Sequence, residues 1–187
     1  WDNCGLQVGD PEMEVRKVLV CLDVTEEVVD EAMASGFQMI VSHHPLLFRG
    51  LKQVSNSTYQ QRCVVKAIKN DIAIYSAHTS LDNAPHGVNF KIASILGLKD
   101  LRWLKAASSE AFGSGIVGEL PHPEEDEKFF ARVKESFKVE CLLHSQCDGR
   151  MIRTVALCGG AGAFLMRDAA AAGADVFLSG EFHYHDY

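Results

Sequence analysis

The sequence lacks the features that mark several common classes of protein. Its six cysteines form no CxxC pair, so neither a zinc ribbon nor a thioredoxin-like motif is indicated. No uninterrupted apolar run approaches the roughly 18 residues of a membrane span. Lys and Arg number 18 against 25 Asp and Glu, which gives a net charge of −7, and no basic patch is evident. We therefore expect no membrane span, and nucleic-acid binding is disfavoured because phosphates need clustered basic side chains.

The cysteines also bear on the compartment of the protein. They are scattered, and several lie inside apolar stretches such as VLVCLDV and TVALCGG, where a free thiol packs as a small hydrophobic group. Disulfides are rare in reducing compartments, so this cysteine usage predicts such a compartment, most simply the cytoplasm.

The first half of the chain alternates stretches that are typical of strands and helices. Thr25 and Gly36 flank one of them in the positions of an N-cap and a C-cap. Alternation of this kind predicts a parallel sheet with crossover helices, whose strand carboxyl ends lie at one edge. The expected elements are strand 15–24, helix 25–36, strand 37–44, helix 57–71, a segment 72–82 that starts as a strand at 72–76 and ends in polar residues, and helix 87–98.

The second half is looser but returns to the same alternation. We therefore predict a single α/β domain, two-lobed and three-layered, with mostly parallel sheets. Lobe 1 is expected at about 1–98, a linker at about 99–114 and lobe 2 at about 115–187. The expected elements here are strand 115–120, helix 124–137, strands 139–145 and 153–160, helix 161–173 and strand 174–180.

Polar residues follow three of the expected strands. Ligands collect beyond the carboxyl ends of parallel strands, so these segments are expected to meet at a site. Imidazole with carboxylate is a ligand set for Zn²⁺, Fe²⁺, Mn²⁺ or Ni²⁺. The segments contain Ser42, His43 and His44; His78, Thr79 and Asp82; and Ser179, Glu181, His183, His185 and Asp186.

The adjacent histidines favour a site with two metal ions. Adjacent strand side chains point to opposite faces, so the rings of His43 and His44 are expected to diverge. Pro45 ends regular pairing, which lets the rings turn toward different ions. Two ions roughly 3.5–4 Å apart, bridged by a carboxylate such as Asp82, would suit hydrolytic chemistry.

Structural explanations compete with each of these interpretations. A histidine at a strand end is often a hydrogen-bonded surface residue, and residues 78–82 could form a turn in which Asp82 caps the backbone. The segment with His183 and His185 could equally be a solvated tail. The CGGAG stretch favours a tight turn over an anion site, because it lacks the dinucleotide spacing. The opening WDNCGL gives no indication of function, and three other histidines read as structural: His86, His122 and His144.

Taken together, the motifs resemble the Nif-three-like family of dinuclear-metal-centre hexameric proteins, whose members are often described as type 2 homologs of GTP cyclohydrolase I. The resemblance covers nearly the whole chain. It implies a two-lobed α/β fold, a toroidal homo-hexamer with metal sites facing an inner cavity, and two divalent metal ions per subunit. The motifs are WDNCGLQVGD, VSHHPLLFRGL, YSAHTSLDN followed by GVN, ALCGGAGAFL and GADVFLSGEFHYHD.

Carried over from the family, His43 and His44 are metal ligands, and Asp82 is the bridging carboxylate. His78 lies beside the site as an outer partner or proton donor. Glu181 and His183 are expected near the pocket, without replacing the family's last His and Glu ligands. In the family those ligands lie beyond the point where this sequence stops.

Two departures from the family pattern are expected to matter. The short segment between LGL and GSGIVGEL indicates the form without the inserted domain that some members carry. The family's N-terminal helix precedes the position of Trp1, so the sequence is expected to be truncated at both ends and to supply only part of the dinuclear site.

Two functions follow as hypotheses. The first is a metal-dependent hydrolase of a nucleotide-like substrate or another cyclic C–N compound. The second is a non-enzymatic metal-binding protein that acts as a chaperone, insertase or regulator. A scaffold with purely structural histidines is a third, and the clustering of histidines and acids disfavours it.

Overall fold

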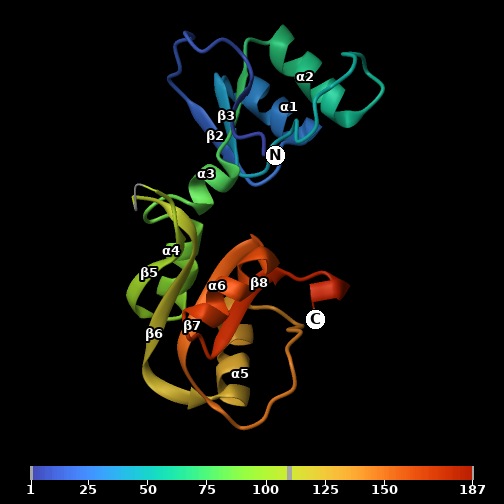
Figure 1. Ribbon diagram of the computed structural model, residues 1–187. Coiled ribbons are helices and arrows are strands. Elements are labelled where there is room, and N and C mark those ends of the chain that lie inside the picture. Colours follow the sequence, from blue (N-terminus) through green and yellow to red (C-terminus); the bar gives the residue numbers. More distant parts are fainter. Residues whose placement is uncertain (1, 109–110, 187) are drawn as a thin grey trace. The chain divides into compact units, whose positions relative to one another are not determined.

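The structure is a computed structural model that describes residues 2–108 and 111–186. The chain divides into two compact units, Trp1–Leu81 and Asp82–Tyr187, and each contains a four-stranded sheet with its own helices (Figure 1). The predicted α/β fold with two lobes is confirmed.

The first unit is built on a mostly parallel sheet. Its strand order is β1-β4-β3-β2, in which β2, β3 and β4 run parallel and β1 pairs antiparallel with β4. Helices connect the parallel strands, as the alternating sequence predicted. The elements are β1 (Gly5–Val8), β2 (Val18–Cys21), α1 (Glu26–Ser35), β3 (Met39–Ser42), α2 (Tyr59–Lys69) and β4 (Ala73–Ser76).

Helix α1 begins and ends where its flanking residues predicted. The Thr25 hydroxyl accepts a hydrogen bond from the Val28 amide at 3.4 Å, which satisfies one unpaired N–H of the first turn. Gly36 ends the helix at φ 68°, a left-handed conformation that glycine adopts without Cβ strain. The chain can therefore turn back at once into β3.

The core of the first unit lies between the sheet and its two helices. Ile40 of β3 and Ile74 of β4 are fully buried and pack with Val29 of α1. Strand side chains alternate between the two faces, and on the opposite face Val20 of β2 is 76% exposed. Tyr75 of β4, on that same face, is 38% exposed. The helices α1 and α2 thus cover one face of this sheet (Figure 1).

The second unit has a mixed sheet in the order β5-β6-β7-β8. Strands β7 and β8 run parallel, whereas β5 with β6 and β6 with β7 are antiparallel. The elements are α4 (Val88–Ile95), β5 (Lys99–Ala106), β6 (Gly113–Glu125), α5 (Asp126–Phe137), β7 (Met151–Ala161), η1 (Ala163–Leu165), α6 (Met166–Ala171), β8 (Val176–Glu181) and η2 (Tyr184–Asp186).

Helices pack on both faces of the second sheet, which gives three layers there. Helices α4 and α5 pack on one face, around the buried side chains of Phe129 and Leu157. Helix α6 packs on the other face, where Ala169 contacts Val117 and Ala156. Ala156 and Leu157 are consecutive in β7, so they point to opposite faces and each belongs to a different core.

The structure differs from the expected elements in three places. Residues 99–106, expected within the linker, form β5, and the units divide at residue 82 because α4 packs on the second sheet. Residues 109–110 of the expected linker lie outside the described residues. The expected strand 139–145 contains no regular element, and β1 was not expected at all. Short, partly exposed strands of this kind carry little sequence signal.

The cysteines differ in burial, and their reactivity is expected to differ with it. Cys63 and Cys158 are buried, and burial raises the pKa of each thiol to about 11, with added effects of the Glu26 and Asp82 carboxylates. Cys141 is exposed. Because the thiolate is the reactive form, we expect N-ethylmaleimide at neutral pH to label Cys141 and to spare the two buried thiols until unfolding. Peptide mass spectrometry checks this, and equal labelling of all three in the native protein would contradict it.

Candidate metal centre

Two of the three predicted clusters meet at the carboxyl edge of the first sheet. Strand β3 ends at Ser42 and is followed by His43 and His44, and β4 ends at Ser76, two residues before His78. Because β3 and β4 run parallel, these ends lie side by side. The structure brings the three imidazoles together, with ring centroids between 4.8 and 5.9 Å apart.

Backbone hydrogen bonds hold both adjacent histidines. His43 N donates to Cys21 O at 3.2 Å, and His44 N donates to Leu22 O at 3.0 Å. The carbonyl of His43 accepts a hydrogen bond from His78 N at 2.9 Å. Pairing with the β2 side therefore continues for two residues past the end of β3, and the positions of the rings are defined by the backbone.

The two adjacent rings lie closer together than the strand pattern predicted. Their centroids are 4.8 Å apart at an interplanar angle of 64°, although successive strand side chains point to opposite faces. The buried Ser42 hydroxyl donates to His44 O at 2.8 Å, and the buried Ser76 hydroxyl donates to His43 O at 2.9 Å. These bonds bend the chain before Pro45, so the rings of His43 and His44 stay within reach of one site.

His44 and His78 each contact a carboxylate through Nδ1. His44 Nδ1 lies 2.8 Å from Oδ1 of Asp23, which follows β2, and His78 Nδ1 lies 2.6 Å from Asp2 Oδ1. When a carboxylate accepts the Nδ1 proton, Nε2 keeps the lone pair that a metal ion or a proton can bind. The first pair is half-exposed, with side chains 48% and 60% accessible, whereas the second is more buried, at 19% and 11%.

Asp2 is the centre of a hydrogen-bonded cluster. His78 Nδ1 donates to Oδ1, while Cys4 Sγ, at 3.0 Å, and Thr79 Oγ1 donate to Oδ2. Burial would raise the pKa of Asp2, but these three hydrogen bonds outweigh it and hold the pKa well below its usual range. Asp2 therefore keeps its negative charge beside His78 across the physiological pH range.

Asp2 and Cys4 were not among the predicted site residues. They lie in the opening WDNCGL, which had given no indication of function, and Asp2 is 76 residues away from His78 in the chain. The antiparallel pairing of β1 with β4, which begins at Gly5, brings the two together. The alternation of Leu6 and Val8 was the available signal for this strand, and it is only four residues long.

His78 has an unusual backbone conformation. Its φ is 28°, which few residues other than glycine adopt and which costs on the order of 1–3 kcal/mol. The hydrogen bonds of its N–H to His43 O and of its Nδ1 to Asp2 hold it there, at the start of helix α3 (His78–Asp82). Strain held by surrounding contacts is typical of functional sites.

The remaining predicted residues belong to the second unit. Asp82 is the last residue of α3, and its carbonyl accepts a hydrogen bond from Asn89 Nδ2 at 2.9 Å. Glu181 ends β8, and His183 lies 3.5 Å from the carboxylates of both Glu181 and Asp186. Because β8 belongs to the second sheet, the expectation that all three clusters share one sheet edge is wrong. That Asp82, Glu181 and His183 take part in a metal site stays a prediction.

Most of the CGGAG stretch belongs to the end of β7, which runs through Ala161 and shifts its register with β8 between Cys158 and Ala161. Gly162 N donates to Ser179 Oγ at 2.8 Å, and that hydroxyl donates to Gly160 O at 2.8 Å. A Cβ at Gly162 would lie 2.6 Å from the Cβ of Cys158, so this position requires glycine. The tight turn expected for this stretch is therefore wrong, because its first four residues continue the strand as an irregular end of β7. A 3₁₀ turn and the six-residue helix α6 follow it.

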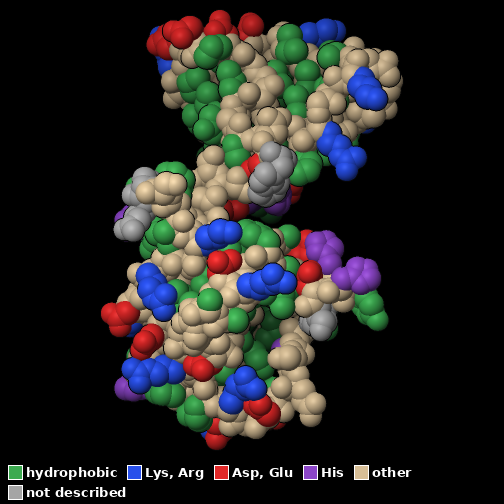
Figure 2. All heavy atoms as spheres, viewed as in Figure 1, with side chains coloured by type: hydrophobic (Ala, Val, Ile, Leu, Met, Phe, Trp, Pro, Cys, Tyr) green, Lys and Arg blue, Asp and Glu red, His purple; other side chains and the backbone are tan. Residues whose placement is uncertain are grey.

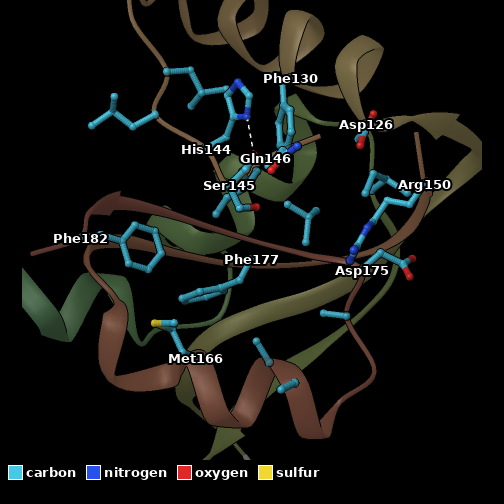
Figure 3. A pocket seen from close by; sticks show the side chains of 18 residues that line it. Asp126, Phe130, His144, Ser145, Gln146, Arg150, Met166, Asp175, Phe177 and Phe182 are labelled. Carbon is cyan, nitrogen blue, oxygen red and sulfur yellow. Dashed lines mark hydrogen bonds between the residues drawn. The ribbon is translucent and has the colours of Figure 1, made fainter. Parts of the chain in front are cut away.

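A cavity of about 570 Å³ lies in the second unit (Figure 3). The stacked rings of Phe130 and His144, with centroids 4.6 Å apart, lie on one side, and Phe177 and Phe182 lie on another. The carboxylate of Asp126 accepts hydrogen bonds from three backbone N–H groups, at 2.8, 3.0 and 3.1 Å. None of the predicted metal ligands lines this cavity, whose lining is mainly apolar.

The visible surface of the second unit carries mixed charge. Figure 2 shows Lys and Arg side chains interspersed with Asp and Glu side chains on this face. A nucleic-acid surface typically has its basic residues gathered in a continuous patch or stripe. The charge pattern of this face therefore agrees with the net charge of −7 in offering no such stripe.

The donor set at the edge of the first sheet fits a transition-metal ion. It combines three imidazoles with the carboxylates of Asp2 and Asp23, which orient two of the rings. Neutral imidazole held by a neighbouring carboxylate is the usual arrangement of a metal-binding histidine. Zn²⁺, Fe²⁺, Mn²⁺ and Ni²⁺ all accept such ligands.

Comparison with known proteins places the chain among relatives that share its fold and are longer than it. A family model described as Duf34/NIF3 (NGG1p interacting factor 3) matches residues 1–187. A "GTP cyclohydrolase 1 type 2 homolog" of Clostridium acetobutylicum is 34% identical over 188 residues, which cover 99% of this chain and 70% of the relative. A Streptomyces coelicolor protein of the same name is 38% identical over 190 residues, covering 99% and 67%. A solved Bacillus cereus protein related to NIF3 superposes with a TM-score of 0.88 at 27% identity, covering 99% and 78%.

Proposed function

We propose a metal-dependent activity for this chain, which belongs to the Duf34/NIF3 (NGG1p interacting factor 3) family. In this proposal His43, His44 and Asp82 hold two divalent metal ions, and a bound substrate is hydrolysed there. The observation that supports it is the cluster of three imidazoles at the carboxyl edge of the first sheet, in which His44 and His78 each contact a carboxylate through Nδ1.

Each residue has its own part in the proposed chemistry. His43 and His44 would each hold one of the ions, and the Asp82 carboxylate would help to hold the pair. A pair of bound divalent ions makes water acidic enough to ionise near neutral pH and polarises the bond under attack. His78, whose Nδ1 contacts Asp2, exchanges a proton with the reacting groups through Nε2. Asp23 orients His44 through Nδ1.

The names of the relatives suggest a class of substrate. Relatives that share 34–38% identity with this chain are called GTP cyclohydrolase 1 type 2 homologs. We therefore propose a nucleotide-like substrate, or another cyclic compound, in which a ring C–N bond is opened by water. The CGGAG stretch has no assigned part in this binding, because most of it is the paired end of β7.

Elemental mass spectrometry tests this proposal. The protein is purified without a His tag, incubated with Zn²⁺, Mn²⁺ or Fe²⁺, and compared with Asp82→Ala. We expect the variant to lose one or both ions of the proposed pair, because a bridging carboxylate binds both. Equal metal content in the two proteins would contradict the part assigned to Asp82. A hydrolysis screen of nucleotides with the bound metal then tests the substrate class.

A metal-delivery role is the second candidate function, and the exposure of His44 favours it. The His44 side chain is 48% accessible and its partner Asp23 60%, so an ion there could pass to another protein. A carrier exchanges metal rapidly and shows no turnover, whereas a hydrolase retains its metal pair while substrate is consumed. Exchange of a zinc isotope, measured beside the hydrolysis screen, separates the two.

Asp23 should affect metal affinity without being a ligand. Asp23→Asn keeps the shape of the side chain but weakens its hold on His44 Nδ1, and loss of such partners typically weakens metal binding about 10- to 100-fold. Titration with a competing chelator measures this change. Asp30→Asn is the matched control, because Asp30 lies in the same unit and bonds Lys66 instead. An unchanged affinity in Asp23→Asn would contradict the role assigned to the pair.

Assembly and location stay predictions. None of the helices in the described part of the chain is long and apolar enough to cross a bilayer. We propose a homo-hexamer in the cytoplasm on the basis of the family resemblance and the cysteine usage. Size-exclusion chromatography with light scattering tests the first, and a monomer at micromolar concentration would contradict it.

A further inference from the structure

Three side chains of different metal-ligating types, those of Asp2, Cys4 and His78, come together in the first unit. The ligand atoms of Asp2, Cys4 and His78 all lie within 4.8 Å of one another. His78 contributes Nδ1 to this group, so its Nε2 is left for the His43 and His44 side. The group is therefore chemically distinct from the proposed pair, because it contains none of the ligands proposed for that pair.

The composition of this group selects a class of metal ion. One thiolate, one imidazole and one carboxylate form a mixed S/N/O set, and a soft thiolate favours Zn²⁺ over harder ions such as Mg²⁺ or Mn²⁺. Three protein ligands leave a fourth tetrahedral position open for water or a substrate atom. The His43 and His44 side, in contrast, offers only imidazole and carboxylate.

The distances in the cluster are close to those that a zinc ion requires. Asp2 Oδ1 lies 2.6 Å from His78 Nδ1, and Cys4 Sγ lies 3.0 Å from Asp2 Oδ2. Ligand atoms around a tetrahedral zinc ion lie roughly 3.2–3.8 Å apart, so shifts of about 1 Å or less would admit the ion. The Thr79 hydroxyl already bonds one carboxylate oxygen and lies 3.4 Å from Cys4 Sγ, which holds both ligands in place.

The fold also anchors the segment that carries two of these ligands. Asn3 Nδ2 donates to Leu47 O at 2.6 Å, and Leu47 N donates to Gln7 Oε1 at 2.8 Å. The pairing of β1 with β4 then begins at Gly5. These contacts tie the residues on both sides of Cys4 to the loop after the histidine pair, so the cluster is built from a fixed part of the first unit.

We propose that Asp2, Cys4 and His78 bind one Zn²⁺ ion, at a site separate from the ions proposed at His43 and His44. Binding releases the proton of the Cys4 thiol to solvent, and the Nδ1 proton of His78 moves to Nε2. Zinc at Nδ1 therefore makes His78 a hydrogen-bond donor on its other nitrogen. The site would in this way set whether His78 gives or accepts a proton in the neighbouring chemistry.

Cobalt substitution tests the proposal, because thiolate bound to Co²⁺ gives a sulfur-to-cobalt charge-transfer band in the near ultraviolet. The reduced, metal-free protein is titrated with Co²⁺ without oxygen, as wild type, as Cys4→Ser and as Cys21→Ser. We expect the band in the wild type and in Cys21→Ser. In Cys4→Ser we expect the band to disappear and the number of bound Co²⁺ ions to fall by one per chain. Cys21 is the matched control, since it lies at the end of β2 beside the histidine pair.

Two results would overturn the inference. One is a wild-type protein that takes up Co²⁺ at saturation without the band, and the other is a band that survives in Cys4→Ser. Unchanged circular dichroism shows that Cys4→Ser is folded. The double variant His43→Ala/His44→Ala separates this inference from the proposed function. If this variant keeps the band but binds fewer ions in total, the result supports both the zinc site and the proposed ion pair. If its total metal content is unchanged, the result contradicts only the proposed ion pair.

Discussion

Replacing His43 and His44 together with alanine is expected to remove the proposed metal pair and any hydrolysis that depends on it. The variant should bind those ions more than about 100-fold more weakly, because each loses a direct ligand and not only an orienting partner. Metal content should fall by about two ions per chain. Elemental analysis and chelator titration measure both effects.

The double variant should still fold. The hydrogen bonds that fix this segment run from backbone N–H groups to Cys21 O and Leu22 O, and from Ser42 and Ser76 hydroxyls to backbone carbonyls, so none needs an imidazole. The variant His86→Ala/His122→Ala removes the same number of imidazoles from exposed positions, and it should keep the full metal content. If the His43/His44 variant and the control both keep their full metal content, the histidine pair does not bind metal and has only a structural role.

Phe129→Ala should cause the largest loss of stability in the second unit. Its ring is fully buried in α5 against both the sheet and α4, and truncating such a ring leaves a cavity that typically costs about 3–5 kcal/mol. Phe130→Ala is the matched control. Phe130 follows it in the same helix but is only partly buried and lines the cavity beside His144.

Urea denaturation followed by circular dichroism compares the two variants. Phe129→Ala should lower the midpoint of the transition much more than Phe130→Ala does, because only the first removes fully buried surface. An equal loss in both would mean that the packing around α5 differs from the structure. A loss below about 1 kcal/mol for Phe129→Ala would contradict the assignment of this ring to the core.

The local parts of the fold were predictable because their signals are local. Thr25 and Gly36 mark the two ends of α1 through hydrogen bonding and backbone conformation, which depend on few neighbours. The histidine pair before Pro45 follows a short apolar run that forms β3, as the alternating pattern indicated. Parallel pairing of β3 with β4 then places His78 beside the pair, which follows from topology.

The rest depends on pairings between distant segments, which one sequence does not reveal. Asp2 reaches His78 only because β1 joins the sheet antiparallel to β4, and a four-residue strand gives little periodicity. In the same way, β5 and β6 add antiparallel pairings to the second sheet. His183 follows β8 of this second sheet, whereas His43 follows β3 of the first. The sequence thus indicated the imidazoles, whereas the carboxylates that orient them appeared only in the structure.

Anomalous X-ray diffraction from crystals grown with Zn²⁺, recorded on both sides of the zinc absorption edge, tests the central claim most directly. Zinc is bound by histidine nitrogen at about 2.0–2.1 Å, so the account predicts anomalous peaks at that distance from ring nitrogens of His43 and His44. Peaks only at other histidines, or none beside this pair at saturating zinc, would contradict the claim that the carboxyl edge of the first sheet is a metal centre.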